Sequence, residues 1–328
     1  MISREQSTAL KGLLICLIVL GHNVFFSEVF HTGSWVWLYS FHVPCFFILP
    51  FFYPEREFSW QRVKKNARRL LWPYTYMFVS LFLVNYFIRK EATLDGGLVN
   101  TYLTGNQYRL KDYTGFQYLW FLPPMFSMLV FKDVYSLGKK ALNRILLAAG
   151  GLCFIIAWVF FFIAPYSISV NATLAQYSIL SCMLGLGMFF LGHVTSRIVS
   201  KWNVSKWFCA GILAVSLLVT CISYGESATY MVVHWVSRAV CPIAAFCLLL
   251  NGRGYNLPLF RKLGELSLPI YLFHQPVNYV TGTLLASWGL PPAVSLAVSF
   301  VFVLTVSYFL SKLLTLNRFT NKVLFAKS

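Results

Sequence analysis

The chain has 328 residues and a formal net charge of +17, yet only 11% of its residues are Asp, Glu, Lys or Arg. Hydrophobic residues make up 58% of the chain and aromatic residues 18%, whereas about 25% of the residues in an ordinary soluble domain are charged. This composition excludes an ordinary soluble domain and indicates a polytopic membrane protein.

Ten apolar segments of about 17 to 25 residues follow one another along the chain. They cover residues 8–27, 36–53, 70–88, 118–136, 145–164, 174–193, 207–224, 230–250, 266–288 and 292–315. We expect each to cross the membrane as a helix, so that the chain forms an all-α polytopic membrane protein with a bundle of about ten transmembrane helices. No cleavage pattern sets the first segment apart, so we expect a retained span and not a signal peptide. No linker divides the chain, which predicts a single transmembrane domain over residues 1–328.

The positive charge follows the expected topology. With the N-terminus in the cytoplasm, 19 of the 27 Lys and Arg residues fall in inner segments, and the C-terminus is also cytoplasmic. The outer side has four, all in the long loop 89–117. Basic residues on the inner side set the orientation of a membrane protein and attract anionic membrane lipid. The charge therefore predicts no nucleic-acid partner.

The first predicted span contains two polar side chains that hydrocarbon disfavours, Lys11 and His22. Their separation of eleven residues is about three turns plus 20°, so both project from nearly the same helix face. His22 would lie about 20 Å into the helix, beyond the bilayer midpoint. A neutral imidazole there is a candidate general base or nucleophile. The alternative is a histidine that only hydrogen-bonds a neighbouring helix.

The second and third spans add further candidates. His42 lies near the outer end of the second span and either approaches His22 or packs at the interface. Lys65 and Arg69 are four residues apart on a helix that continues into the third span, where they can form an anion clamp at the cytoplasmic entrance. Neighbouring Arg68 adds to this charge.

Later spans hold more polar residues whose role is open. His234 and Arg238 are four apart on one face, and a carbonyl or the nearby Glu226 is the simplest partner for the arginine. His274 precedes Pro276, where a helix kink frees a carbonyl that the ring could bond. Polar residues at membrane depth are functional candidates by default.

The predicted spans offer little for metal or proton chemistry. All eight cysteines lie within spans or at their edges without CxxC spacing, which favours small apolar packing residues over a zinc site or a disulfide framework. Of ten Asp and Glu residues only Asp133 falls inside a span. We therefore predict no metal site and no permanently bound cofactor.

Five segments together resemble the acyltransferase-3 family of integral-membrane O-acyltransferases, which acetylate envelope glycans and other acceptors. They are LKGLLICLIVLGHN, SFHVPCFFILPFF, KKNARRLLWPY, YLWFLPPMF and LGELSLPIYLFHQPV, in the family's order. In that family a basic residue, ten intervening positions and a histidine mark the first helix, and a basic pair opens the third. The pattern maps onto Lys11 and His22, then onto Lys65 and Arg69; Lys11 stands where the family usually has Arg.

The resemblance implies a stand-alone acyltransferase of the bacterial inner membrane. Its co-substrate would be acetyl-CoA, and its acceptor an envelope glycan or a lipid-linked sugar. We expect Lys65, Arg68 and Arg69 to hold the phosphates of CoA, and His22 and Lys11 to be the catalytic residues. His22 would activate the acceptor hydroxyl directly or through an acetyl-histidine intermediate, and Lys11 would supply a point charge along the path of the pantetheine arm. A flippase or exporter of a lipid-linked glycan is the alternative, since a basic cavity and a long outer loop would serve it too, although the sequence lacks the repeated halves expected of one.

Overall fold

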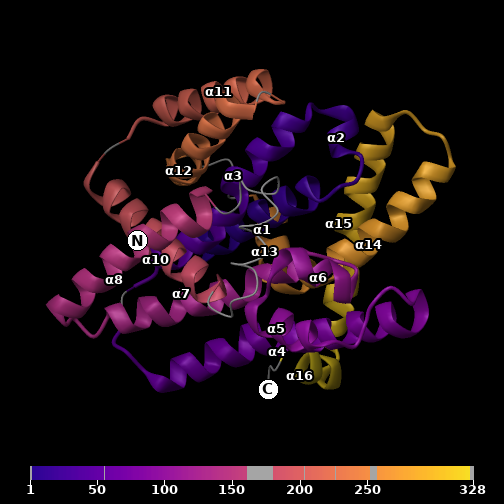
Figure 1. Ribbon diagram of the computed structural model, residues 1–328, viewed down its shortest axis with the longest axis horizontal. Helices are drawn as coiled ribbons and strands as arrows, with labels where there is room; N and C mark the ends of the chain where they lie inside the picture. The colour runs from indigo at the N-terminus through magenta and orange to yellow at the C-terminus, as the bar shows by residue number, and fades with distance from the viewer. Residues whose placement is uncertain are drawn as a thin grey trace. The chain divides into compact units, whose positions relative to one another are not determined.

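The computed structural model describes residues 2–54, 56–160, 180–202, 204–225, 227–251 and 257–325. In these ranges the chain forms helices joined by loops, and no strand occurs among them (Figure 1). The all-α fold is therefore confirmed. The chain divides into two compact units, Met1–Tyr53 with Val194–Thr315 and Pro54–His193 with Leu316–Ser328. A single domain over residues 1–328 stays a prediction.

The first unit contains the amino-terminal helices and most of the carboxyl-terminal half. Its helices are α1 Arg4–Gly21, α2 Phe26–Val29, α3 Thr32–Ile48, η1 Leu49–Phe52, the end of α10 Leu180–Lys201, α11 Lys206–Ser223, α12 Ser227–Asn251, α13 Pro258–Glu265, α14 Ser267–Ser287 and α15 Pro292–Leu316. Helix α3 packs against α1, α11 and α12, and α1 also packs against α13 and α14.

Helix α1 is fixed at its start and along its side. Ser3 and Gln6 form a capping box, in which each side chain bonds the backbone of the other residue at 3.1 and 2.9 Å. Further along, a β-carbon at Gly12 would overlap the carbonyl oxygen of Phe260 in α13, and one at Gly264 would overlap the backbone of α1. Glycine at both positions therefore lets the two backbones touch.

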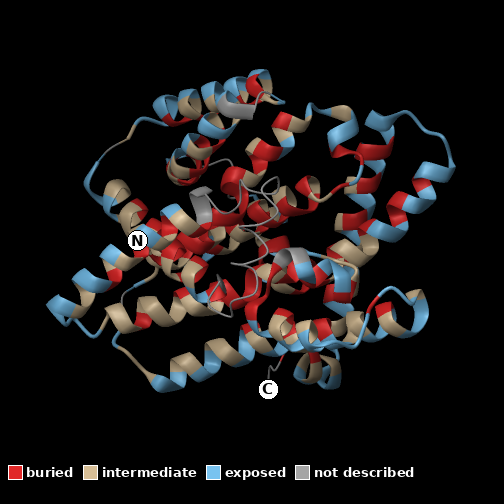
Figure 2. Cartoon of the chain, viewed as in Figure 1, coloured by how far each residue is buried: buried red, intermediate tan, exposed pale blue. Residues whose placement is uncertain are grey.

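Burial differs sharply between the helices of this unit. Helix α3 is largely buried, whereas α11, which lies beside α12, exposes most of its surface (Figures 1 and 2). The exposed side chains of α11 include Trp207, 76% exposed, and Ile222, 72% exposed. Large apolar side chains on the outside are what a helix in contact with lipid requires, because lipid replaces water as the solvent.

The second unit contains α4 and the helices that follow it up to the first part of α10. Its helices are α4 Trp60–Val84, η2 Asn85–Arg89, α5 Gly96–Thr104, α6 Gln107–Thr114, η3 Tyr118–Phe121, α7 Leu122–Tyr135, α8 Lys140–Cys153, η4 Phe154–Phe160 and α16 Arg318–Phe325. Helix α4 packs against α6, α7 and α16. The predicted outer loop 89–117 thus contains two short helices, α5 and α6.

Two polar contacts fix helices of the second unit. Arg62 of α4 donates from Nη1 to Oδ1 of the buried Asp133 in α7 at 2.8 Å. Asp95 caps the start of helix α5 and accepts hydrogen bonds from the amide of Gly97 at 2.7 Å and from the hydroxyl of Tyr113 in α6. Asp133, the one acidic residue predicted inside a span, is therefore paired with an arginine.

Seven helices in the described ranges are long and apolar enough to cross a membrane: Thr32–Phe52, Trp60–Arg89, Lys140–Ala157, Ser181–Lys201, Lys206–Ser223, Thr229–Asn251 and Pro292–Leu316. The predicted spans 8–27, 118–136 and 266–288 correspond to α1, α7 and α14. Parts of the predicted spans 145–164 and 174–193 lie outside the described residues. The polytopic membrane class is confirmed, whereas ten crossings and the sides of the termini stay predictions.

Candidate active site

His22 lies at the carboxyl end of α1, where it caps the helix with backbone angles φ −91° and ψ 0°. Its Nδ1 is 2.8 Å from the carbonyl oxygen of Ile18. A carbonyl oxygen only accepts hydrogen bonds, so in the neutral ring Nδ1 carries the proton and Nε2 keeps its lone pair. The half-buried ring is therefore a base whose basic nitrogen is Nε2.

Side chains from two other helices hold this end of α1. Asn278 of α14 donates from Nδ2 to the carbonyl oxygen of His22 at 2.5 Å. The carbonyl oxygen of Gly21 accepts from Trp35 Nε1 at 2.9 Å and from the Tyr39 hydroxyl at 3.3 Å, both on α3. The last carbonyls of a helix have no partner within it. The position of His22 is thus set by tertiary contacts.

Gly21 lies close to side chains of α3. A β-carbon there would lie 3.2 Å from Leu38 Cδ2 and 3.3 Å from Tyr39 Cε2, which is tighter than ordinary van der Waals contact. The same position is 3.8 Å from Cε1 of His42. Glycine therefore allows Leu38 and Tyr39 of α3 to pack closely against the end of α1.

Three imidazoles and a tyrosine gather around this end of α1. The ring centroids of His22 and His274 are 5.0 Å apart, and the Tyr39 ring lies 5.5 Å from His22 and 4.7 Å from His42. Nδ1 of His42 and of His274 each lies 2.6 Å from a carbonyl oxygen of its own helix. All three rings therefore have Nε2 as the basic atom. Within the described ranges no set of three His, Cys, Asp or Glu side chains could hold a metal ion.

Three buried polar atoms of this cluster have no hydrogen-bond partner among the described residues: His42 Nε2, Asn278 Oδ1 and Asn23 Nδ2. The three side chains are at most 4% exposed. The contacts of the other amide atoms fix which atom is oxygen, because Asn23 Oδ1 accepts from the amide of Phe25 at 3.0 Å. A buried polar atom left without a partner costs about 1 to 3 kcal/mol. The cluster is therefore prepared to bind water or a polar ligand.

Lys11 is half-buried within α1. Eleven residues at a 1.5 Å rise place Lys11 and His22 about 16 Å apart along the helix axis. Lys11 adjoins Gly12, where α1 meets α13. Helical spacing thus predicts one shared face for Lys11 and His22, with the two side chains too far apart along the axis to touch each other.

The predicted anion clamp lies on α4 in the second unit. Lys65, Arg68 and Arg69 are all exposed, and Lys65 and Arg69 share one helix face because they are four residues apart. Arg62, one turn earlier, is instead turned to Asp133. Three exposed cations within five residues form a basic surface suited to a phosphate group.

A comparison with protein families decides the class of this protein. A family model for an acyltransferase domain matches residues 5–312. The chain belongs to the acyltransferase-3 family. A search of curated proteins and a search of solved structures gave no match. As a member of this family the chain is a multi-pass membrane acyltransferase, which confirms the family that the five sequence segments indicated.

Sequence reasoning missed how this acyltransferase holds His22. Asn278 follows His274 by four residues, so their helical spacing places both on the face of α14 that contacts the end of α1. That spacing was the available signal. The His274 ring bonds a main-chain carbonyl, that of Tyr271. This residue lies five positions before Pro276, so its carbonyl is not the one four positions earlier that a proline in a helix releases. Trp35 gave no such signal, because its indole caps a backbone carbonyl 14 residues earlier.

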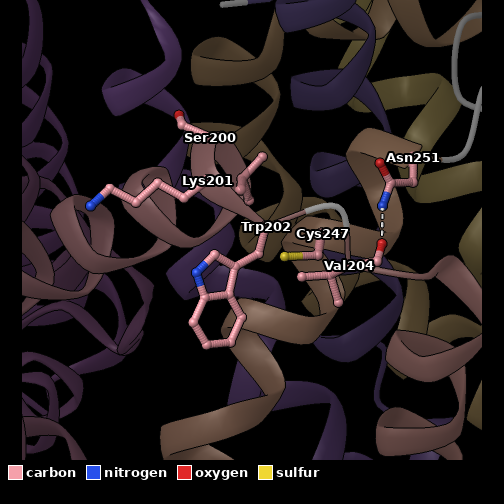
Figure 3. A pocket seen from close by; sticks show the side chains of 7 residues that line it. Ser200, Lys201, Trp202, Val204, Cys247 and Asn251 are labelled. Carbon is pink, nitrogen blue, oxygen red and sulfur yellow. Dashed lines mark hydrogen bonds between the residues drawn. The ribbon is translucent and has the colours of Figure 1, made fainter.

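A separate cavity of about 250 Å³ lies in the first unit of this acyltransferase, at the end of α10 (Figure 3). Trp202, Val204 and Cys247 line it, and Asn251 donates from Nδ2 to the carbonyl oxygen of Val204 at 2.9 Å. The side chain of Lys201 points away from these groups in Figure 3. Its lining contains none of the predicted site residues, so we assign it no part in acyl transfer.

Proposed function

We propose that this protein is an O-acetyltransferase of the bacterial inner membrane, which moves an acetyl group from acetyl-CoA to a hydroxyl of an envelope glycan or a lipid-linked sugar. Membership of the family supports acyl transfer in general. The 2.8 Å contact between His22 Nδ1 and the carbonyl oxygen of Ile18 carries the proposal. It supports a base at His22, because Nε2 is then ready to accept a proton.

Transfer forms one carbon–oxygen bond and breaks one carbon–sulfur bond. His22 Nε2 takes the proton of the acceptor hydroxyl as its oxygen attacks the thioester carbonyl carbon. The carbon–sulfur bond then breaks, and the imidazolium returns that proton to the thiolate of CoA. In the covalent variant Nε2 itself attacks the thioester carbonyl carbon, and the carbon–sulfur bond breaks as CoA leaves as a thiolate. The acceptor hydroxyl then attacks the acetyl-imidazolium, the carbon–nitrogen bond breaks, and the hydroxyl proton passes to the thiolate. Both routes begin from the same neutral tautomer.

The basic residues of α4 are assigned to the donor. We propose that Lys65, Arg68 and Arg69 bind the phosphates of CoA, for which arginine offers a planar pair of donors and lysine a point charge. Their exposure and their spacing support this role. Lys11 is proposed to act as a second point charge on the α1 face that carries His22. No permanently bound cofactor is required by these steps.

Replacement of His22 tests the catalytic assignment. In inside-out membrane vesicles supplied with labelled acetyl-CoA and isolated envelope glycan, His22→Ala should abolish acceptor-dependent release of CoA. The amount of protein in the membrane should not change. His193→Phe is the matched control, because the His193 ring packs against the rings of Tyr135 and Phe189 and a phenyl ring keeps that packing. Undiminished transfer by the His22 variant would refute the proposal.

The donor assignment has its own test. Lys65→Ala together with Arg69→Ala should raise KM for acetyl-CoA by about three- to tenfold, the effect of losing charge-assisted hydrogen bonds at an exposed site. Lys64→Ala, an exposed neighbour on the same helix, should leave KM unchanged. An equal rise of KM in the double variant and in Lys64→Ala would contradict a specific phosphate site at Lys65 and Arg69, because the general positive charge of the helix would then account for both.

The acceptor is identified by mass spectrometry of surface glycans from cells with and without this protein. A mass difference of one acetyl group on a glycan supports the proposed acceptor, and identical glycans contradict it. Movement of lipid-linked glycan across the vesicle membrane without release of CoA would instead favour the exporter.

A further inference from the structure

A second polar site lies in the first unit, on α12, and acyl transfer as proposed does not use it. Arg238 is 7% exposed and His234 is 3% exposed, within a helix that is apolar enough to cross a membrane. The sequence favoured a carbonyl or Glu226 as partner of the arginine, and Glu226 lies outside the described residues. The structure shows that Nε of Arg238 donates to Nε2 of His234 at 2.8 Å.

This contact fixes the tautomer of His234. A guanidinium group keeps its protons in proteins, so the contact requires an unprotonated Nε2 as acceptor. The neutral ring must then carry its proton on Nδ1. Nδ1 is buried and has no hydrogen-bond partner among the described residues. His234 therefore presents a buried N–H donor without an acceptor, which is unfavourable unless a ligand supplies one.

Aromatic rings connect this donor with His31, which caps the start of α3. The Tyr230 ring stacks on His234 with centroids 5.6 Å apart and an interplanar angle of 8°. Tyr224 follows at 5.4 Å from Tyr230, and His31 at 5.4 Å from Tyr224. His31 is exposed. A row of rings thus leads from the surface of this unit to the buried pair.

We propose that Arg238 and His234 form a binding site for a phosphate group. A fixed positive charge next to an unsatisfied donor disfavours a cation and is matched by an oxyanion that accepts from both. The helix that carries the pair is long and apolar enough to cross a membrane, so the phosphate comes either from a phospholipid headgroup or from free phosphate. The site is separate from the catalytic assignment of His22 and stands without it.

The site is tested by thermal unfolding of the full-length protein in a non-ionic detergent. One arm adds inorganic phosphate against sodium chloride of equal ionic strength, and the other adds phosphatidylglycerol against phosphatidylcholine. We expect a saturable rise of the unfolding midpoint with phosphate, with phosphatidylglycerol, or with both, since a ligand that binds only the folded state stabilises it. The arm that responds identifies the source.

Variants assign the effect to this pair. Arg238→Gln should weaken the apparent affinity at least about tenfold, because it removes the charge and its hydrogen bonds. Arg238→Lys keeps the positive charge, so this variant should fold. It should also bind phosphate about tenfold more weakly than the wild type, because lysine lacks the planar guanidinium group that donates two parallel hydrogen bonds. Arg261→Gln is the control, since Arg261 is part exposed and pairs with Glu5 at 3.2 Å. No saturable stabilisation of the wild type, or equal affinity in Arg238→Lys and wild type, would overturn the proposal.

Discussion

Asn278 offers the sharpest test of how His22 is held. Asn278→Ala removes the 2.5 Å hydrogen bond to the carbonyl oxygen of His22 and leaves that oxygen without its side-chain partner from α14. Such a loss costs about 1 to 3 kcal/mol. If about 1.4 kcal/mol of it is lost from the transition state, kcat falls about tenfold. We expect KM for acetyl-CoA to stay unchanged, because Asn278 is not part of the proposed phosphate site.

The assay is acceptor-dependent release of CoA from vesicles, with two further variants. Asn278→Asp has the same size but at neutral pH cannot donate, so its kcat should also fall; the loss should lessen at lower pH, where a protonated carboxyl can donate. Thr281→Val is the control, because its buried hydroxyl donates to the Val277 carbonyl of its own helix and not to His22. Wild-type kcat in Asn278→Ala, or an equal loss in Thr281→Val, would refute the positioning role.

Two further predictions concern packing and pH. Gly12→Ala should sharply reduce the yield of monodisperse protein in size-exclusion chromatography, because its methyl group would overlap the Phe260 carbonyl; Gly211→Ala, with open space around it, should not. The hydrogen bond from Tyr113 lowers the pKa of Asp95 below its usual value. Ionised Asp95 therefore stabilises the folded loop fully above about pH 4, and this stabilisation is lost as the pH falls below that value and the carboxylate is protonated. Hydrogen exchange in α5 and α6, corrected for intrinsic rates, should therefore increase below pH 4 and change less in Asp95→Ala.

The helical class was predictable because long apolar runs have one stable form in lipid. The backbone must satisfy its own hydrogen bonds there, and composition alone reveals such runs. Helix boundaries were harder to predict, as α1 shows. The predicted span 8–27 ends six residues beyond Gly21, the last residue of α1, because the helix stops at His22. That stop depends on side chains of α3 and α14, and such distant caps leave no local mark in sequence.

Part of the candidate site was also predictable from the sequence. His22 and Lys11 were visible because a polar residue in an apolar run is rare and helical periodicity shows their shared face. The approach of His274 to His22 was not visible, since 252 residues separate them in the chain. Two glycines permit such approaches in the first unit, at Gly21 and Gly12, yet glycine in an apolar helix does not reveal its partner.

The remaining ring nitrogen accepts a proton in His22 and donates a hydrogen bond in His234, and the contacts of the two rings explain this difference. In His22 a carbonyl oxygen occupies Nδ1, so the remaining nitrogen is a base that can take a proton from a hydroxyl. In His234 an arginine N–H occupies Nε2, so the remaining nitrogen is a donor that can bind an anion. The partner on one ring nitrogen therefore decides the chemistry of the other. Replacing the arginine should change His234 from a donor into a ring free to adopt either tautomer, whereas no side-chain substitution removes the Ile18 carbonyl from His22.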